Sequence, residues 1–311
     1  MTSCLKKNQN IKLRYKMKFK IITCCFLFIS NGVFAMDYNK FSFELRTMKT
    51  YCYAEINGID IADSHVRMGM ISSGYDISNI IENGKNTMSI YFAGIDEDDS
   101  KKISKGDYCT LLIKRKTKDS IVNYTSLIGD SLNNLASGKN SPHYDGLEQT
   151  GKVNEGYWSE NDQIYKVERT FTVSGVREWE WTKGEVISKS EKNRNKIYAK
   201  YKSMYEKLKS NNKQQLMDFY HVALNESAIN DGSSIESEWN SLGISQMLDD
   251  GYVPRLDYID NYNIVTYANG KLFRLEDEYG NSPIKMEKKN QNTRTLSPYL
   301  AYVDGGIIVA L

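Results

Sequence analysis

The segment Gly74–Gly94, which reads GYDISNIIENGKNTMSIYFAG, decides the fold expected for the first half of this 311-residue chain. Asp76 is a residue type that caps the start of a helical turn, and Gly84 is the type that ends one. Over Thr87–Phe92 apolar and polar side chains alternate, which places three apolar side chains on one face: Met88, Ile90 and Phe92. The segment therefore predicts a helical turn over residues 77–82, followed by a strand with one face in a core.

Further short alternating runs surround that segment and give the first half an all-β pattern. Strands are expected at residues 41–45, 50–56, 59–61, 108–113, 165–173 and 176–181. Asn57-Gly58 is a strong signal for a tight hairpin between two of them. Residues 130–161 are polar and rich in Gly, Asn and Ser, so we expect a long loop or an irregular insertion there. The pattern predicts a β-sandwich over residues 37–184.

Several residues of this half stand in the order found in one known sandwich family. Asn57-Gly58 is followed by Gly74-Tyr75, by Asp76-Ile77 with Ile80-Ile81, and by Gly84 and Asn86 before the strand. This order resembles the galactose-binding-like jelly-roll domain, familiar as the sugar-binding domain beside glycosidase catalytic barrels. The resemblance implies a jelly-roll fold, and since one fold hosts many functions it implies no function by itself. The rest of the chain is too short to hold such a barrel.

The second half has a helical period and then a return to strands. Ile197, Tyr201, Met204 and Leu208 follow the spacing of an amphipathic helix within residues 185–210, and further helices are expected at 214–224 and 235–248. Strands are then expected at 263–268, 271–276, 283–287, 299–303 and 307–311. We therefore predict an α+β domain over residues 185–311, with its strands in an antiparallel meander.

The N-terminal segment has the layout of a secretory signal peptide. Lys18 and Lys20 precede the apolar run 21–29, and Val33-Phe34-Ala35 supplies residues suited to a cleavage site. The apolar run is shorter than the roughly 20 residues that a membrane-spanning helix needs. We therefore expect residues 1–35 to be removed during export to the periplasm.

Two alternatives for the N-terminus stay open. Met17 is an attractive start of translation, which would make the first 16 residues an upstream extension. Lipid modification of Cys24 or Cys25 is the alternative to simple cleavage, although Thr23 is a poor residue before such a cysteine.

Export would change the charge of the protein. The whole chain has 41 basic and 39 acidic residues, and seven of the basic ones lie within residues 1–35. Removing those seven leaves 34 basic residues against the same 39 acidic ones, a net charge of −5. Nucleic-acid binders need a clustered basic surface, so we expect no nucleic-acid partner.

Cys52 and Cys109 are the two cysteines that follow residue 35. Both lie in strand-like runs of the first half, and the periplasm is an oxidising compartment. We favour a disulfide between them, with two buried free thiols as the alternative.

The run Arg177-Glu178-Trp179-Glu180-Trp181 is the most chemically suggestive motif. On a strand, Glu178 and Glu180 would share one face about 6.5–7 Å apart, a separation that suits the acid and base of an inverting glycosidase. Trp179 and Trp181 would face the other way. The favoured interpretation makes the tryptophans core residues, and the alternatives are a stacking platform for sugars or a catalytic carboxylate pair.

The acidic run Asp96-Glu97-Asp98-Asp99 follows the core strand and is the other candidate binding element. It lacks the alternating ligands and the glycine of a calcium loop, so a solvated turn or a contact with a basic partner is expected. The three histidines of the chain fit no metal-ligand spacing, and no serine lies in a GxSxG motif. We expect no metal, no cofactor and no catalytic set.

These features predict an exported, non-catalytic binding protein. In architecture and composition the chain resembles periplasmic immunity proteins, which neutralise toxins delivered by rival cells, and this implies a toxin or effector protein as the partner. A carbohydrate-binding envelope protein is the alternative. A glycan-cleaving enzyme is the third choice.

Overall fold

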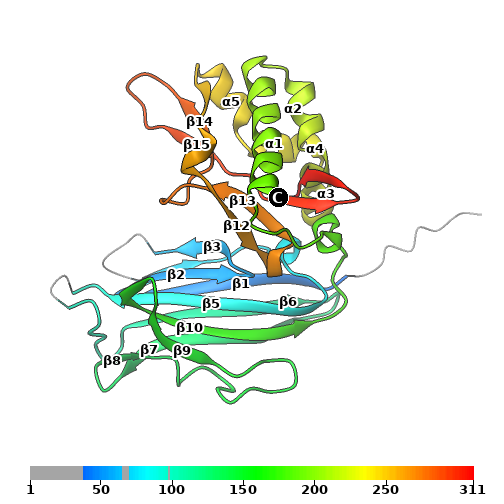
Figure 1. Ribbon diagram of the computed structural model, residues 1–311. Helices are drawn as coiled ribbons and strands as arrows, with labels where there is room; N and C mark the ends of the chain where they lie inside the picture. The colour runs from blue at the N-terminus through cyan, green and yellow to red at the C-terminus, as the bar shows by residue number, and fades with distance from the viewer. Residues whose placement is uncertain (1–37, 65–69, 97–98) are drawn as a thin grey trace, which may run out of the picture. The chain divides into compact units, whose positions relative to one another are not determined.

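The computed structural model describes residues 38–64, 70–96 and 99–311, which Figure 1 draws in colour. They belong to one compact unit, Asp37–Leu311. The predicted signal peptide, with Met17, Cys24 and Cys25, lies outside the described residues. Within the described ranges, no helix has both the length and the apolar character needed to cross a membrane.

Two five-stranded sheets form the first half, and both are antiparallel throughout. The first sheet has the order β4 (Met70–Ser73), β1 (Lys40–Met48), β6 (Tyr108–Lys116), β7 (Ile121–Leu132) and β8 (Leu135–Ser137). The second sheet has the order β3 (Ile59–Asp63), β2 (Thr50–Ile56), β5 (Gly84–Gly94), β10 (Asn161–Val173) and β9 (Asn154–Trp158). Figure 1 shows these long strands running side by side in the lower part of the view.

The two sheets enclose one core in a sandwich-like arrangement. Met88, Ile90 and Phe92 of β5 are buried in it, as their alternation predicts, and they belong to the same cluster as Phe41 and Phe43 of β1. A predominantly β first half with antiparallel sheets is therefore confirmed. Its assignment to the jelly-roll class stays a prediction.

The turn predicted before β5 is a short 3₁₀ helix, η1 (Ser78–Ile80). Asp76 accepts a hydrogen bond from the backbone N–H of Ser78 at 2.8 Å, as a capping residue does. Gly84 has a φ of +103°, a conformation that side chains disfavour, and the chain turns there into β5.

Two buried asparagines, Asn57 and Asn86, join η1 to β5. Asn57 Nδ2 donates to the Ile80 carbonyl and to Asn86 Oδ1, both at 2.8 Å, and its Oδ1 accepts from the N–H of Thr87 at 2.9 Å. Asn86 accepts from the N–H of Glu82 at 3.1 Å and donates to the Glu82 carbonyl at 2.8 Å. Since a buried amide is costly when it lacks partners, this mutual bonding explains both asparagines of the motif.

Cys52 of β2 and Cys109 of β6 form a disulfide, as predicted. Their Cα atoms are 6.0 Å apart, and 57 positions separate them in sequence. Because β2 lies in the second sheet and β6 in the first, the bond links the two layers through the core.

The prediction of a long loop or an irregular insertion over residues 130–161 is correct for residues 138–153, which form no helix or strand. It is wrong for the two ends of the range, which hold the end of β7 with β8, and β9. Asn133 and Asn134 both have positive φ and make the tight turn between β7 and β8. β8 and β9 are short edge strands with little buried surface, so their sequence is polar and resembles that of a loop.

The second half begins with helices. They are α1 (Glu191–Lys209), α2 (Lys213–Phe219), α3 (His221–Asp231), α4 (Ile235–Ser241) and α5 (Ile244–Asp249). The predicted apolar face of α1 is buried: Ile197, Tyr201, Met204 and Leu208. The helix expected over 235–248 is divided into α4 and α5, because Gly243 between them adopts a left-handed φ of +65°.

Strands follow the helices, as expected, but they form two antiparallel sheets and not the single meander that the sequence predicts. One sheet has the order β11 (Val253–Leu256), β14 (Ile284–Glu287) and β15 (Arg294–Leu296). The other has the order β12 (Asn263–Tyr267), β13 (Leu272–Glu276), β16 (Leu300–Val303) and β17 (Gly306–Val309). All their pairings are antiparallel. Three further 3₁₀ turns are η2 (Glu180–Lys183), η3 (Ile259–Asn261) and η4 (Ala268–Gly270).

The strands of the second half pack directly on the sandwich. Tyr267, Ala268 and Leu272 are buried in the same cluster as the sandwich core. The N–H of Ala268 donates to the Asn57 carbonyl at 2.8 Å, and Lys271 Nζ pairs with Glu82 at 2.6 Å. The second half of the chain therefore binds to Asn57 and Glu82, two residues that also take part in the asparagine network. The division at residue 184 into two domains stays a prediction.

A second contact joins α3 to η2 through a buried carboxylate. Glu226 is 6% exposed, and one of its oxygens accepts from the N–H of Glu180 at 2.7 Å. Its other oxygen is buried without a hydrogen-bond partner among the described residues. The pKa of Glu226 is raised from 4.5 to about 7, mainly by burial and in smaller part by the negative charge of Glu180, while the hydrogen bond from the Glu180 N–H and the charges of Arg177 and Lys183 oppose this rise.

Loss of the disulfide should lower the stability of the protein. A crosslink over this sequence separation restricts the unfolded chain by about 3–4 kcal/mol on the chain-entropy model. We expect Cys52→Ala/Cys109→Ala to reduce the free energy of unfolding in urea by that amount. Wild-type protein under reducing conditions should unfold at the same urea concentration as the variant. Equal stability of oxidised wild type and variant would contradict the prediction.

The raised pKa of Glu226 should make stability depend on pH. The folded state binds this proton more tightly than the unfolded state, so the stabilisation is complete below pH 4.5 and is lost as the pH rises to about 7. Glu226→Gln should therefore be more stable than wild type at pH 8, by roughly 1–3 kcal/mol, and should lose this advantage at pH 4.5. Urea unfolding at both pH values measures this. Glu206→Gln, at an exposed position of α1, is the matched control and should show no such crossover.

Candidate functional site

Trp179 and Trp181 lie in the core and are 2% and 0% exposed. Their indole N–H groups donate to the backbone carbonyls of Ser78 at 2.6 Å and Asn79 at 2.8 Å. Both tryptophans therefore anchor η1, and neither has a ring face free to stack on a sugar.

The strand predicted over residues 176–181 is wrong, so Glu178 and Glu180 do not share the strand face on which the alternative of a catalytic pair was based. The chain there is irregular and then forms η2. The N–H of Glu180 bonds to Glu226 instead of a neighbouring strand, and the Glu180 carboxylate pairs with Lys183 at 2.6 Å. Because two tryptophan N–H groups fix this segment against η1, it cannot continue as a flat strand.

The acidic run is described only in part, since Glu97 and Asp98 lie outside the described residues. Asp99 accepts a hydrogen bond from the N–H of Lys101 at 3.2 Å, within the turn that follows β5. Asp96 has no assigned secondary structure. Among the residues that the structure describes, no cluster of three or more His, Cys, Asp or Glu side chains is placed to hold a metal ion.

A different group of residues forms a pocket on the outer face of the second sheet. Along β2, Cys52, Ala54 and Ile56 point into the core, so Tyr51, Tyr53 and Glu55 point outwards. We call the depression beside them the aromatic pocket. Its remaining lining residues are Cys52, Asp63, Ser64, Tyr91, Phe92, Ala93, Trp158 and Ile164.

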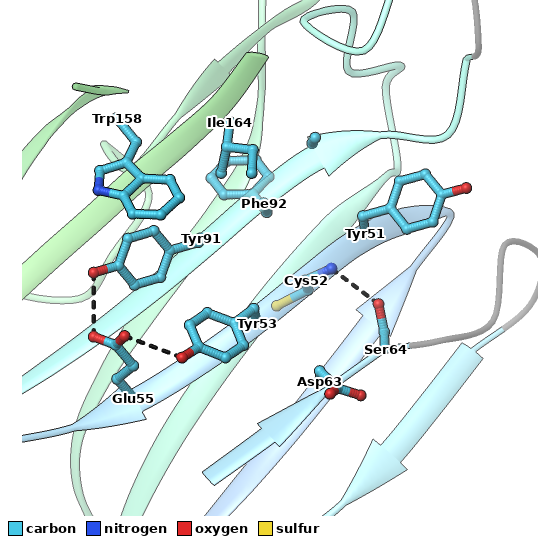
Figure 2. Close-up of a pocket in the computed structure, with 11 residues that line it drawn as sticks. Tyr51, Cys52, Tyr53, Glu55, Asp63, Ser64, Tyr91, Phe92, Trp158 and Ile164 are labelled. Atoms are coloured by element: carbon cyan, nitrogen blue, oxygen red, sulfur yellow. Dashed lines mark hydrogen bonds between the residues drawn. The ribbon is translucent and has the colours of Figure 1, made fainter. Parts of the chain in front are cut away.

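The register of the sheet brings the aromatic rings together. Tyr53 of β2 lies opposite Tyr91 of β5, which in turn lies opposite Lys166 of β10. The ring centroids of Tyr53 and Tyr91 are 5.4 Å apart, and those of Tyr91 and Trp158 are 5.2 Å apart in an edge-to-face arrangement. Figure 2 shows the three rings in a row, with Glu55 below them.

The hollow itself results from a small side chain. Ala93 lies opposite Tyr51 in the sheet, between larger residues of the neighbouring strands. Its methyl group leaves space that the surrounding rings do not fill. The pocket has a volume of about 400 Å³, within the range of small-molecule sites.

Glu55 is the polar centre of the pocket. Its carboxylate accepts a hydrogen bond from Tyr91 Oη at 3.1 Å, and it shares the single hydroxyl proton of Tyr53, at 3.2 Å, with the carboxylate of Asp60. Burial raises the pKa of Glu55, an effect that these two hydrogen bonds oppose. The phenols thus hold the carboxylate in one orientation at the edge of the aromatic row, as Figure 2 shows.

Lys166 and Glu168 complete the polar rim. Lys166 Nζ lies 5.2 Å from the centroid of the Tyr91 ring and pairs with Glu168 at 2.6 Å. Ser89 Oγ donates to Glu168 at 2.9 Å. The site therefore combines aromatic faces, fixed hydrogen-bond acceptors and one ammonium donor, a set that can bind a polar ring compound.

Sequence reasoning missed this pocket. The usable signal was the alternation in Tyr51-Cys-Tyr-Ala-Glu55, which places two tyrosines and a carboxylate on the face opposite the core residues. Tyr91 and Trp158 could join them only through strand pairing, since β9 falls in the range expected to be a loop.

Comparison with protein-family models, curated proteins and solved structures finds no match to this chain. The chemistry of the pocket is therefore the basis for a functional proposal.

Proposed function

We propose that the protein is a non-catalytic carbohydrate-binding protein and that the aromatic pocket holds the sugar. The sequence alone favours a protein partner and keeps a carbohydrate ligand as the alternative. With the pocket described, we place the carbohydrate ligand first. The observation that carries the proposal is the row of Tyr53, Tyr91 and Trp158 beside the fixed carboxylate of Glu55.

The pocket suits both chemical faces of a sugar ring. One side of a pyranose presents C–H groups that pack on aromatic rings, and its rim presents hydroxyl groups that need hydrogen-bond partners. Trp158 and Tyr53 are each partly exposed and offer the apolar contact. Glu55 accepts hydrogen bonds from hydroxyls, and Lys166 donates them.

The resemblance to galactose-binding-like domains supports the same proposal through the fold. We propose that the sandwich belongs to that jelly-roll class. Export to the periplasm through the predicted signal peptide would place the protein where envelope glycans are accessible.

Removal of the Trp158 ring should abolish most of the sugar binding. A glycan array with the wild-type protein identifies a ligand, and titration calorimetry then measures the affinity of Trp158→Ala. We expect at least a tenfold loss, about 1.4 kcal/mol, because an aromatic anchor is truncated. Tyr279→Ala is the control, since Tyr279 is 79% exposed and does not line the pocket. Absence of any glycan ligand on the array, or equal affinity of both variants, would contradict the proposed function.

A protein partner is the second candidate, and a specific surface favours it. Tyr258 and Tyr279 are 83% and 79% exposed, and Tyr279 borders a depression lined by four acidic residues: Asp257, Glu276, Asp277 and Glu278. Exposed tyrosines beside acidic side chains suit a basic protein surface, such as that of a cationic toxin or effector.

Affinity capture tests the protein partner through its retention by variants and its release by salt. A partner that binds this surface should be captured by the wild-type protein and not by Tyr258→Ala/Tyr279→Ala. It should also dissociate at about 1 M salt, where the Debye length falls to about 3 Å. Trp158→Ala should still capture it. A partner retained by the double tyrosine variant would exclude this surface.

A further inference from the structure

Acidic side chains dominate the surroundings of the aromatic pocket. Two carboxylates, Glu55 and Asp63, line it, and no lysine or arginine is among the described residues of its lining. Asp60 accepts a hydrogen bond from Tyr53, and Glu168 lies on the same face of the sheet as Glu55. Lys166 on the rim is paired with Glu168, so Glu55 and Asp60 are the carboxylates whose charges favour a cationic ligand over a neutral or an anionic one.

One wall of the site already holds an ammonium group. Lys166 Nζ stands over the Tyr91 ring and pairs with Glu168, so it has both an aromatic face and a carboxylate as partners. These are the two kinds of contact that stabilise an ammonium group away from bulk water.

Glu55 has phenol rings beside it but forms no direct ion pair among the described residues. The charge of Lys166 lowers the pKa of Glu55 from a distance, while the Lys166 ammonium itself is paired with Glu168. A carboxylate has about four lone-pair sites, so two phenol donors leave room for further donors. Tyr53 and Tyr91 flank the carboxylate with their rings, as Figure 2 shows.

We infer that the ligand is a glycan with a free, protonated amino group, whose ammonium is bound by Glu55 while its sugar ring packs on Trp158 and Tyr53. This inference rests on the proposed function and specifies the class of sugar. An acetylated amino group would lose the charge, and a hydroxyl would lose both the charge and two of the three donors. Glu55 is thus the residue that determines specificity.

A matched series of ligands tests the inference. Short β-1,4-linked oligomers of glucosamine, N-acetylglucosamine and glucose share a backbone and differ only at C2. Titration calorimetry should give at least tenfold tighter binding for the glucosamine oligomer, since a charge-assisted hydrogen bond exceeds a neutral one by about that factor. Equal affinities for the three oligomers would overturn the inference and leave the proposed function standing. Binding of none of them would also overturn it, while the glycan array decides separately on the proposed function.

Substitution of Glu55 provides the second arm. Glu55→Gln should lower the affinity for the glucosamine oligomer about tenfold. The weaker affinity for the acetylated oligomer should not change, and this unchanged affinity shows that the variant is folded. Glu278→Gln, at an exposed acidic residue outside the pocket, is the matched control and should bind all three oligomers as wild type does. Equal loss of all three ligands with Glu55→Gln would reduce Glu55 to a structural role and overturn the inference.

Discussion

The buried pair Asn57–Asn86 is the interaction on which the rest of the structure depends. The Asn57 side chain bonds to backbone groups of Ile80 and Thr87, and the Asn86 side chain bonds to those of Glu82, so the turn η1 and the strand β5 have one fixed relation. The carbonyl of Asn57 also accepts a hydrogen bond from the N–H of Ala268, which connects the second half of the chain to the same network. Because partly satisfied buried polar groups are costly, this network specifies one arrangement of the sandwich and of the strands above it.

That arrangement also sets the position of the pocket. β2 ends and β5 begins beside the asparagine pair, which fixes their register so that Ile56 lies opposite Met88. One position further along each strand the outward-facing Glu55 lies beside Ser89, and two positions beyond that Tyr53 lies beside Tyr91. A slip of one residue would turn the tyrosines into the core, so the same alternation that builds the core also builds the binding face.

Local sequence patterns predicted much of the fold, because the apolar residues of the long strands and of α1 recur with the spacing of a strand or a helix. The buried faces of β5 and α1 follow directly from their sequences. Predictions failed where long-range bonding overrides local pattern: tryptophan N–H groups fix residues 176–181 against η1, and polar edge strands resemble loops. The site was less predictable than the fold, since Tyr53, Tyr91 and Trp158 come from three strands and meet only through register.

The small side chain of Ala93 has a consequence for how this surface can change over evolutionary time. The pocket exists because one outward position carries a methyl group, while the core beneath is built by the alternate positions of the same strand. An Ala93→Val substitution would narrow the hollow. Because Ala93 is itself buried and the core residues Cys52 and Phe92 also line the hollow, such a change would alter the shape of the binding face and the packing beneath it together.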